Sequence, residues 1–183
     1  MNIQDLERLY AQLPQVSALA SELGKAMSRR GSQAGDSPAQ TIFLEGLLGS
    51  SVTMLFASLS VKCQSRLLFV LQDAEEAGYF YHDLTQLLGD RQVLFFPSSY
   101  RRAVKYAQRD SASEILRTEV LSRLSAPRDN TYLYIVTYPE ALAELVVSRQ
   151  TLDTRTLVLE KDQTIDISDI TRTLRDFGFR EVD

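Results

Sequence analysis

The residues of this sequence whose types and spacing come nearest to a known chemistry lie between positions 46 and 53. Their pattern is close to the phosphate-binding loop G-x-x-x-x-G-K-[ST], in which backbone N–H groups and a lysine hold nucleotide phosphates and a hydroxyl group binds Mg²⁺. Gly46 and Thr53 occupy the outer positions, but Ser51 replaces the second glycine and Val52 replaces the lysine. Because a valine cannot neutralise phosphate charge, we expect neither ATP binding nor a catalytic residue here.

Two other interpretations of the same residues remain open. In the first, Gly46 and Gly49 only form a turn that joins a strand to a helix. One of the two serines that follow, Ser50 or Ser51, is then the N-cap of the helix. In the second, the turn binds a phosphate-bearing metabolite, since a helix N-terminus attracts anions even without a lysine. A ligand screen distinguishes the metabolite interpretation from ATP binding.

A basic cluster lies further along the chain, where Tyr100 and Tyr106 flank Arg101, Arg102 and Lys105. Arginines can bind phosphates and tyrosines can stack on bases, which suits a contact with nucleic acid. The alternative is a basic loop that balances nearby acidic residues. The net charge of −4 argues against binding of nucleic acid over the whole surface, so any contact with DNA must be local.

The composition excludes several other kinds of site. A single cysteine, Cys63, allows no internal disulfide, and with His82 as the only histidine we expect no metal site. We expect the thiol in the core and the imidazole on a helix surface. No stretch approaches ~18 continuous apolar residues, and the N-terminus lacks the pattern of a signal peptide. We therefore expect a cytoplasmic protein with no membrane partner.

The first 38 residues are expected to form helices and a linker. Apolar residues recur at helical spacing on both sides of Pro14, which predicts two short helices or one helix broken there. Residues 28–38 are polar, contain glycine and lack periodicity, which is typical of a flexible connection. We therefore expect three parts, at residues 1–38, 39–147 and 148–183.

From residue 41 onward, short apolar runs alternate with amphipathic helical patterns, which predicts an α/β fold with a parallel sheet. The runs are almost continuously apolar, so we expect helices to cover both faces of the sheet. The predicted strands are residues 42–44, 67–71, 93–96, 132–136 and 156–159.

The clearest predicted helix begins at Asp73, where Glu76 completes a capping box, and ends at Gly89. Three more helices are predicted at residues 51–62, 111–124 and 140–146, the last with Pro139 as its first residue. We expect Ser168 to be the N-cap of a final helix. The side chains expected to face inward are Ile115, Leu116, Val120, Leu121 and Leu124 in the helix at 111–124, and Ile170, Leu174 and Phe177 in the final helix.

Four segments together carry a resemblance: F-L-E-G-L-L-G-S-S at 43–51, L-F-V-L-Q-D-A-E-E-A at 68–77, L-F-F-P at 94–97 and I-V-T-Y-P-E-A-L at 135–142. Their order resembles the N-terminal region of bacterial transcription-repair coupling factor, over nearly all of residues 41–183. That region is similar to the repair helicase subunit UvrB, but two departures favour the coupling factor. UvrB keeps the glycine and lysine that are missing at Ser51 and Val52, and residues 96–110 are too few for the long tyrosine-rich hairpin with which UvrB separates DNA strands.

The resemblance implies a three-layer parallel sheet of the P-loop NTPase and UvrB-like type with a degenerate nucleotide loop. N-terminal helices precede this sheet, and the opening part of a second, small α/β domain follows it. Family members recognise RNA polymerase stalled at DNA damage, displace it with an ATP-driven translocase and recruit UvrA for nucleotide excision repair. The translocase, with its ATP and Mg²⁺, lies in a different part of the family's chain, so no cofactor is expected here.

The resemblance also implies that this segment belongs to the UvrA-recruiting end, and that it has no ATPase activity of its own. It places residue 183 inside the second domain, before the positions that contact UvrA, so no contact residue is carried over. Two alternatives of other classes remain, which are an ATP-binding, UvrB-like helicase segment and a metabolite-binding α/β domain. Val52 disfavours the first of these.

Overall fold

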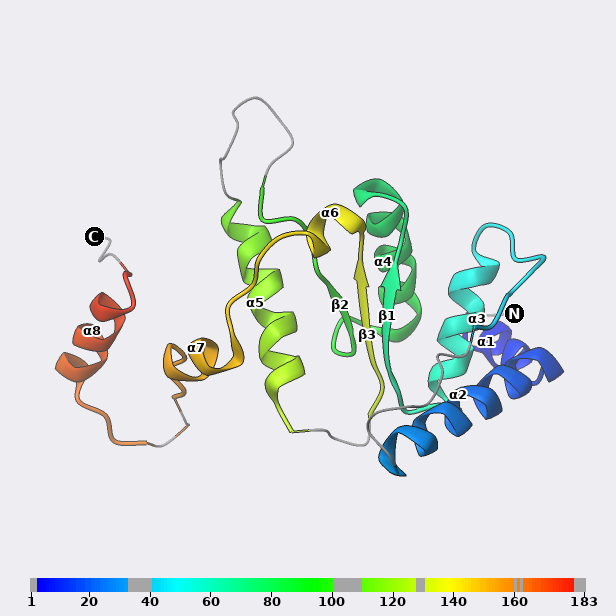
Figure 1. The fold of residues 1–183 in the computed structure, drawn as a ribbon, viewed down its shortest axis with the longest axis horizontal. Coiled ribbons are helices and arrows are strands. Elements are labelled where there is room, and N and C mark those ends of the chain that lie inside the picture. Colours follow the sequence, from blue (N-terminus) through cyan, green and yellow to red (C-terminus); the bar gives the residue numbers. More distant parts are fainter. Residues whose placement is uncertain are drawn as a thin grey trace. The chain divides into compact units, whose positions relative to one another are not determined.

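The computed structural model describes residues 3–32, 41–100, 110–127, 131–159, 161 and 163–179. The chain divides into two compact units, Met1–Glu144 and Leu145–Asp183, which are described separately here. The first unit holds a mixed α/β arrangement around a small parallel sheet (Figure 1). The second unit holds two helices, α7 and α8.

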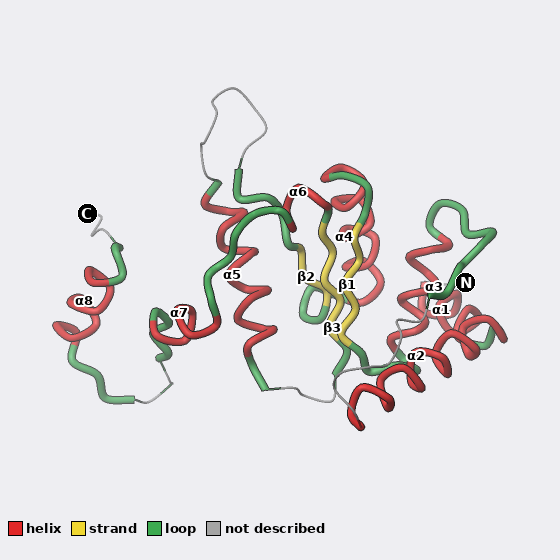
Figure 2. The backbone as a smooth tube through the Cα atoms, viewed as in Figure 1, coloured by secondary structure: helices red, strands yellow, loops and turns green. Residues whose placement is uncertain are grey.

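The sheet of the first unit consists of three parallel strands in the order β1-β3-β2 (Figure 2). These strands are β1 (Arg66–Val70), β2 (Val93–Phe95) and β3 (Leu133–Thr137). All five residues of β3 are buried, as expected for a central strand with helices on both faces. Leu68 of β1 and Leu94 of β2 are both in register with Ile135 of β3, so the prediction of a parallel sheet is confirmed for these strands.

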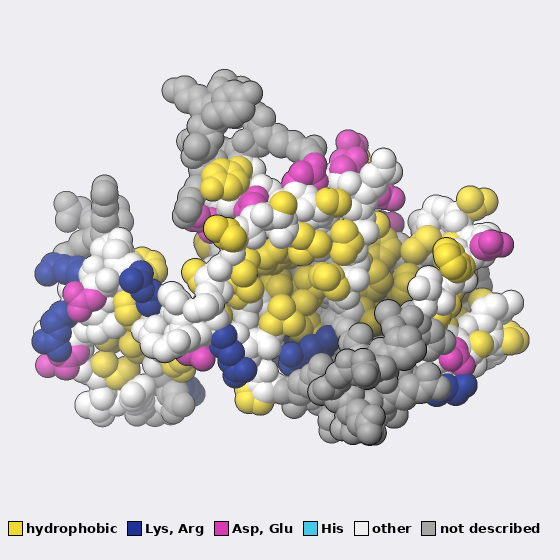
Figure 3. Space-filling view, viewed as in Figure 1, with side chains coloured by type: hydrophobic (Ala, Val, Ile, Leu, Met, Phe, Trp, Pro, Cys, Tyr) yellow, Lys and Arg dark blue, Asp and Glu magenta, His cyan; other side chains and the backbone are white. Residues whose placement is uncertain are grey.

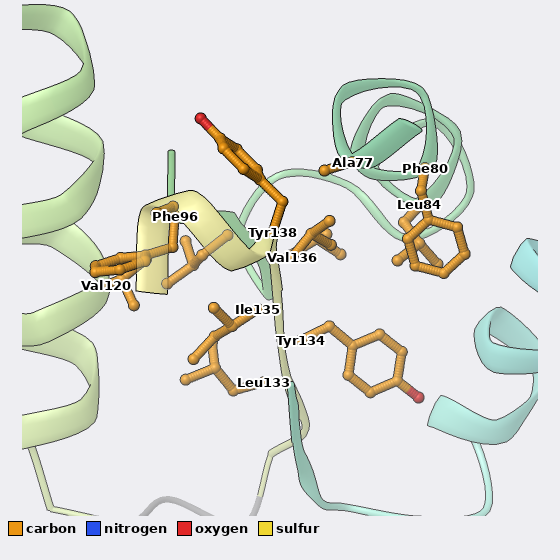
Figure 4. Packing of buried hydrophobic residues seen from close by; sticks show 13 residues of the cluster. Ala77, Phe80, Leu84, Phe96, Val120, Leu133, Tyr134, Ile135, Val136 and Tyr138 are labelled. Carbon is orange, nitrogen blue, oxygen red and sulfur yellow. The ribbon is translucent and has the colours of Figure 1, made fainter. Parts of the chain in front are cut away.

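Helices cover the two faces of the sheet unequally. α3 (Ser51–Ser60) and α4 (Ala74–Leu88) lie on one face, and α5 (Ser111–Ser125) lies on the other (Figure 1). Figure 4 shows that the side chains of alternate residues of β3 point to opposite faces of the sheet, with Leu133 and Ile135 directed towards α5. The expected coverage of both faces is therefore present in part.

An aromatic cluster fills the face that α3 and α4 cover. The ring of Phe69 lies 4.8 Å from that of Phe56, 5.2 Å from that of Phe80 and 5.3 Å from that of Tyr134. The hydroxyl group of Tyr134 donates a hydrogen bond of 2.9 Å to the carbonyl oxygen of Phe56, so this fully buried phenol has an acceptor. Burial raises the pKa of Tyr134 strongly, and the phenol stays protonated at neutral pH.

The face on the α5 side is open over the edge strand β1. Leu68 shares this face with Ile135 through their register, yet Leu68 is 55% exposed and Ile135 is buried. Val70, two residues further along β1, is also exposed. Figure 3 shows hydrophobic surface between α5 and α3 in the same view. The prediction that the strand at 67–71 is buried on both faces is therefore wrong for its α5 side.

The predicted cap of α4 is confirmed with one difference in its partner. The Asp73 side chain accepts hydrogen bonds of 2.9 Å from the N–H groups of Glu75 and Glu76. Glu76 in turn accepts from the N–H of Gln72, one residue before the N-cap, rather than from Asp73 itself. At the other end Gly89 has a φ of 78°, a conformation that glycine adopts without strain.

The N-terminal residues form two helices, α1 (Ile3–Ala11) and α2 (Pro14–Ser32), which agrees with one of the two predictions for this region. The predicted flexible connection at 28–38 is wrong for residues 28–32, which continue α2. Pro14 is the first residue of α2, where its missing N–H is not needed. Val16 and Leu19 of α2 pack with Leu55, Leu59 and Cys63 in a second, smaller core. Cys63 is buried and His82 is exposed, so both of these predictions are confirmed.

Two predicted strands are wrong. Residues 41–45 form no strand, and Phe43 is 86% exposed. Residues 156–159 also lack strand structure, and helix α7 (Arg149–Thr154) ends just before them. Each run contains only three apolar residues, a length at which an apolar pattern does not distinguish a buried strand from a loop.

Two helix predictions need smaller corrections. α6 (Pro139–Leu142) begins with the predicted proline but ends four residues before 146. The final helix, α8 (Ile167–Asp176), has Asp166 as its N-cap, and Ser168 donates to Asp166 instead of capping. Ile170, Leu174 and Phe177 are half-buried, and Gly178 has a φ of 92° after the helix end. No helix among the described residues has the length and apolar character needed to cross a membrane.

Candidate functional site

The loop before α3 is a tight turn built from glycines and serines. Gly46 and Gly49 have φ angles of 80° and 53°, which side-chain-bearing residues adopt at a cost. The hydroxyl oxygen of Ser51 accepts a hydrogen bond of 2.7 Å from the N–H of Leu48, and the N–H of Ser51 donates to the carbonyl oxygen of Leu48 at 3.1 Å. Ser50 is the N-cap residue, but its side chain makes no capping hydrogen bond.

The two positions that would carry nucleotide chemistry face the protein. Val52, at the lysine position of the phosphate-loop pattern, is half-buried and packs against the main core. Thr53, at the Mg²⁺-binding position, is buried. The segment also does not follow a strand of the sheet, since residues 41–45 are irregular. Its arrangement supplies a turn and a helix start, and its side chains bring no positive charge to the loop.

The predicted basic cluster of Arg101, Arg102 and Lys105 lies outside the described residues. The described chain on its two sides is held together, because the N–H of Asp110 donates a hydrogen bond of 2.8 Å to the carbonyl oxygen of Ser99. Ser99 and Asp110, the described residues near its two sides, therefore lie next to each other beyond the carboxyl end of β2.

A polar cluster that the sequence analysis did not identify lies at the carboxyl ends of β2 and β3. Its centre is Arg117 of α5, whose side chain is only 7% exposed. Nη1 of Arg117 donates hydrogen bonds to the carbonyl oxygens of Pro97, at 2.8 Å, and Ala141, at 3.0 Å. Its guanidinium carbon lies 4.1 Å from the centre of the Phe96 ring, within the range of a cation–π interaction. One arginine thus joins α5 to the segments that follow β2 and β3.

The partner of this arginine is Glu144, whose Oε2 lies 3.5 Å from Nη1 of Arg117. The same carboxylate accepts hydrogen bonds from the hydroxyl groups of Ser98 and Ser99 and from the N–H of Ser99. Although partial burial of the carboxyl group acts to raise its pKa, these hydrogen bonds and the arginine outweigh burial, and the pKa of Glu144 lies below its usual value. The carboxylate is therefore ionised at neutral pH and fully engaged.

The sequence held a weak signal for Arg117. Along α5 the buried side is marked by Val120, and Arg117 lies three residues before it, on the same side of the helix. Ile115 was predicted to face inward but is 69% exposed, and Leu124 is also exposed, so both predictions are wrong. A charged residue at a core position of a helix indicates a buried ion pair, but nothing in the sequence identified Glu144 as its partner.

A groove of about 400 Å³ lies beside β2 and is lined by residues of α4, β2 and α5. The ring of Tyr81 stacks on that of Phe95 at its wall, with 5.2 Å between the ring centres. Two acidic residues, Asp90 and Glu119, and two arginines also line it. Burial first, and then these two carboxylates, raise the pKa of Tyr81. The balanced charges favour neither an anion nor a cation.

Comparison of the chain with protein-family models, curated proteins and solved structures found no match. Among the residues that the structure describes, no group of three or more histidine, cysteine, aspartate or glutamate side chains is arranged to hold a metal ion.

Proposed function

We propose that this chain is the UvrB-like N-terminal part of a bacterial transcription-repair coupling factor. Its role is to help recruit UvrA to DNA damage at which RNA polymerase has stalled, and it hydrolyses no ATP itself. The observation that carries the proposal is the position of the resembling segments in the fold. Residues 68–77 span the end of β1 and the start of α4, residues 94–97 the end of β2, and residues 135–142 the end of β3 together with α6.

This distribution supports the proposal because the carboxyl ends of parallel strands are where folds of this class carry their functional loops. Three of the four segments lie at the three equivalent strand ends of one sheet, which a chance similarity of sequence would not favour. The fourth, residues 43–51, leads into α3 and holds the turn with Gly46 and Gly49.

The absence of ATPase activity is supported by the environment of Val52 and Thr53. Val52 packs against the main core, and Thr53 is buried. Phosphate transfer needs charge compensation by a lysine or an equivalent group, and the residue at this position brings none. We therefore assign the loop a structural role.

The proposal places the UvrA-contacting positions after residue 183. A pull-down with UvrA tests it, using the 183-residue chain beside a version extended by about half a typical domain, roughly 60 residues of the same open reading frame. We expect the extended version to retain UvrA and the shorter one to retain little.

The two other outcomes of the pull-down differ in meaning. Equal and strong binding by both versions places the contact surface within residues 1–183 and contradicts the assignment of the surface. Binding by neither, when the extended version is folded, contradicts the family assignment itself.

A further inference from the structure

The cluster around Arg117 has the composition of a carboxylate-binding site. Two serine hydroxyl groups and one backbone N–H donate to the Glu144 carboxylate, and a buried guanidinium lies beside it. These are the donor types that proteins use to bind a carboxylate ligand. They come from separate parts of the first unit, namely the segment after β2 and the middle of α5, while Glu144 follows α6.

The guanidinium is not fully used by this carboxylate. Nη1 of Arg117 donates to two carbonyl oxygens and lies 3.5 Å from the nearer oxygen of Glu144, which is longer than a direct charged hydrogen bond. Nη2 is buried and finds no hydrogen-bond partner among the residues that the structure describes. A buried donor without a partner costs free energy, so the guanidinium keeps an unsatisfied donor while Glu144 is in place.

We propose that Ser98, Ser99 and Arg117 form a carboxylate-recognition site whose resident ligand is the chain's own Glu144. In the intact chain the site is closed to external anions, and a free carboxylate enters only when Glu144 leaves. The inference rests on the geometry of the first unit and is independent of the function proposed above.

Glu144 is the last residue of the first unit, at the point where the chain leaves it. Its carboxylate is held by three donors on two consecutive residues, Ser98 and Ser99, which follow β2 directly. Occupation of the site therefore fixes the end of the first unit at the carboxyl end of β2. Exchange with an external carboxylate would release that end.

The test is chemical rescue of the Glu144→Ala variant of the 183-residue chain. Thermal unfolding is followed while sodium acetate replaces sodium chloride at constant ionic strength. We expect the melting temperature of the variant to rise with the logarithm of acetate concentration once the site begins to fill, in the millimolar range. The parent chain should not respond, because Glu144 already fills the site.

Two further variants make the result specific. Glu119→Ala removes an exposed acid of α5 outside the cluster, and its response to acetate should match that of the parent chain. Adding Ser98→Ala and Ser99→Ala to Glu144→Ala removes the two hydroxyl donors and should abolish the rescue. If acetate stabilises Glu144→Ala no more than the parent chain, or stabilises all variants equally, the proposal is wrong.

A second measurement covers the case in which Glu144→Ala does not fold. Glu144→Gln keeps the volume of the side chain but removes its charge, so the hydrogen bond from the Ser99 N–H loses its ionic acceptor. We expect hydrogen exchange of the Ser99 amide to speed up about tenfold, as loss of one charge-assisted hydrogen bond predicts. Unchanged exchange at Ser99 would show that the carboxylate is not recognised there.

Discussion

Replacement of Arg117 by methionine tests whether this buried arginine holds the carboxyl ends of β2 and β3 together. Methionine has a similar length and no charge, so the change removes the donors while filling much of the volume. It leaves the carbonyl oxygens of Pro97 and Ala141 without their shared donor, Nη1, and leaves Glu144 without its arginine. The cation–π contact with Phe96 is also lost.

The magnitude follows from these contacts. Each hydrogen bond to a charged donor contributes about 1.5–3 kcal/mol, and a desolvated cation–π contact adds about 1–2 kcal/mol. Relief of the desolvation cost of the buried guanidinium offsets part of this sum. The Glu144 side chain keeps 15% of its exposure and its three serine donors, so it is not left as an isolated buried charge. We expect a net loss of about 3 kcal/mol, at the low end of the range for breaking a buried ion pair.

The chain contains no tryptophan, so urea unfolding is best followed by far-ultraviolet circular dichroism. A loss of about 3 kcal/mol corresponds to a fall in melting temperature of about 6–12 °C for a chain of this size. Arg123→Met is the matched control, because Arg123 also lies on α5 but is half-buried and donates to one side chain, that of Gln92. Its expected loss is about 0.5–1 kcal/mol.

The expectation is refuted if Arg117→Met loses less than about 1 kcal/mol, or no more than Arg123→Met does. Arg117 would then be a tolerated buried charge, and apolar packing of α5 would hold the carboxyl ends of β2 and β3 together. A change in the urea m-value would instead show that the variant altered the compactness of one of the two states.

Three other predictions concern the candidate sites. Calorimetry with Mg-ATP should detect no binding to the parent chain, and a micromolar dissociation constant would overturn this expectation. The Ser51→Gly, Val52→Lys double variant should bind Mg-ATP weakly at most, since Thr53 remains buried. Fluorescence anisotropy with duplex DNA should show at most weak, salt-sensitive binding. This expectation is contradicted by submicromolar affinity at physiological salt that disappears when Arg101, Arg102 and Lys105 are all replaced by alanine. Folding lowers the pKa of Glu144 from its ordinary value of 4.5, so its stabilising contribution should be complete above that value and be lost as the pH falls through the folded pKa. Glu144→Gln should therefore flatten the acid limb of the curve of stability against pH. Parallel acid limbs for the two proteins would contradict the assigned direction.

Local signals in the sequence were sufficient for much of the first unit. The capping residue Asp73 and the terminating Gly89 determined where α4 begins and ends, because both act on the backbone within one turn. The strand runs at 67–71, 93–96 and 132–136 are apolar and continuous enough to require burial, and each became a strand of the parallel sheet. The absence of lysine at position 52 is likewise a property of the sequence alone.

Only the tertiary structure determines which apolar runs pair as strands of the sheet and which side of α5 is buried. Residues 42–44 are as apolar as a short strand, yet Phe43 is exposed, because strand formation requires an edge to pair with and apolar residues alone do not supply one. Arg117 occupies a core position that an apolar residue would normally fill, and its burial is tolerated only because acceptor oxygens of residues 97, 141 and 144 converge on it. Those partners are between 20 and 27 positions away in the sequence, so helical periodicity carries no information about them, and folding of the sheet brings them together.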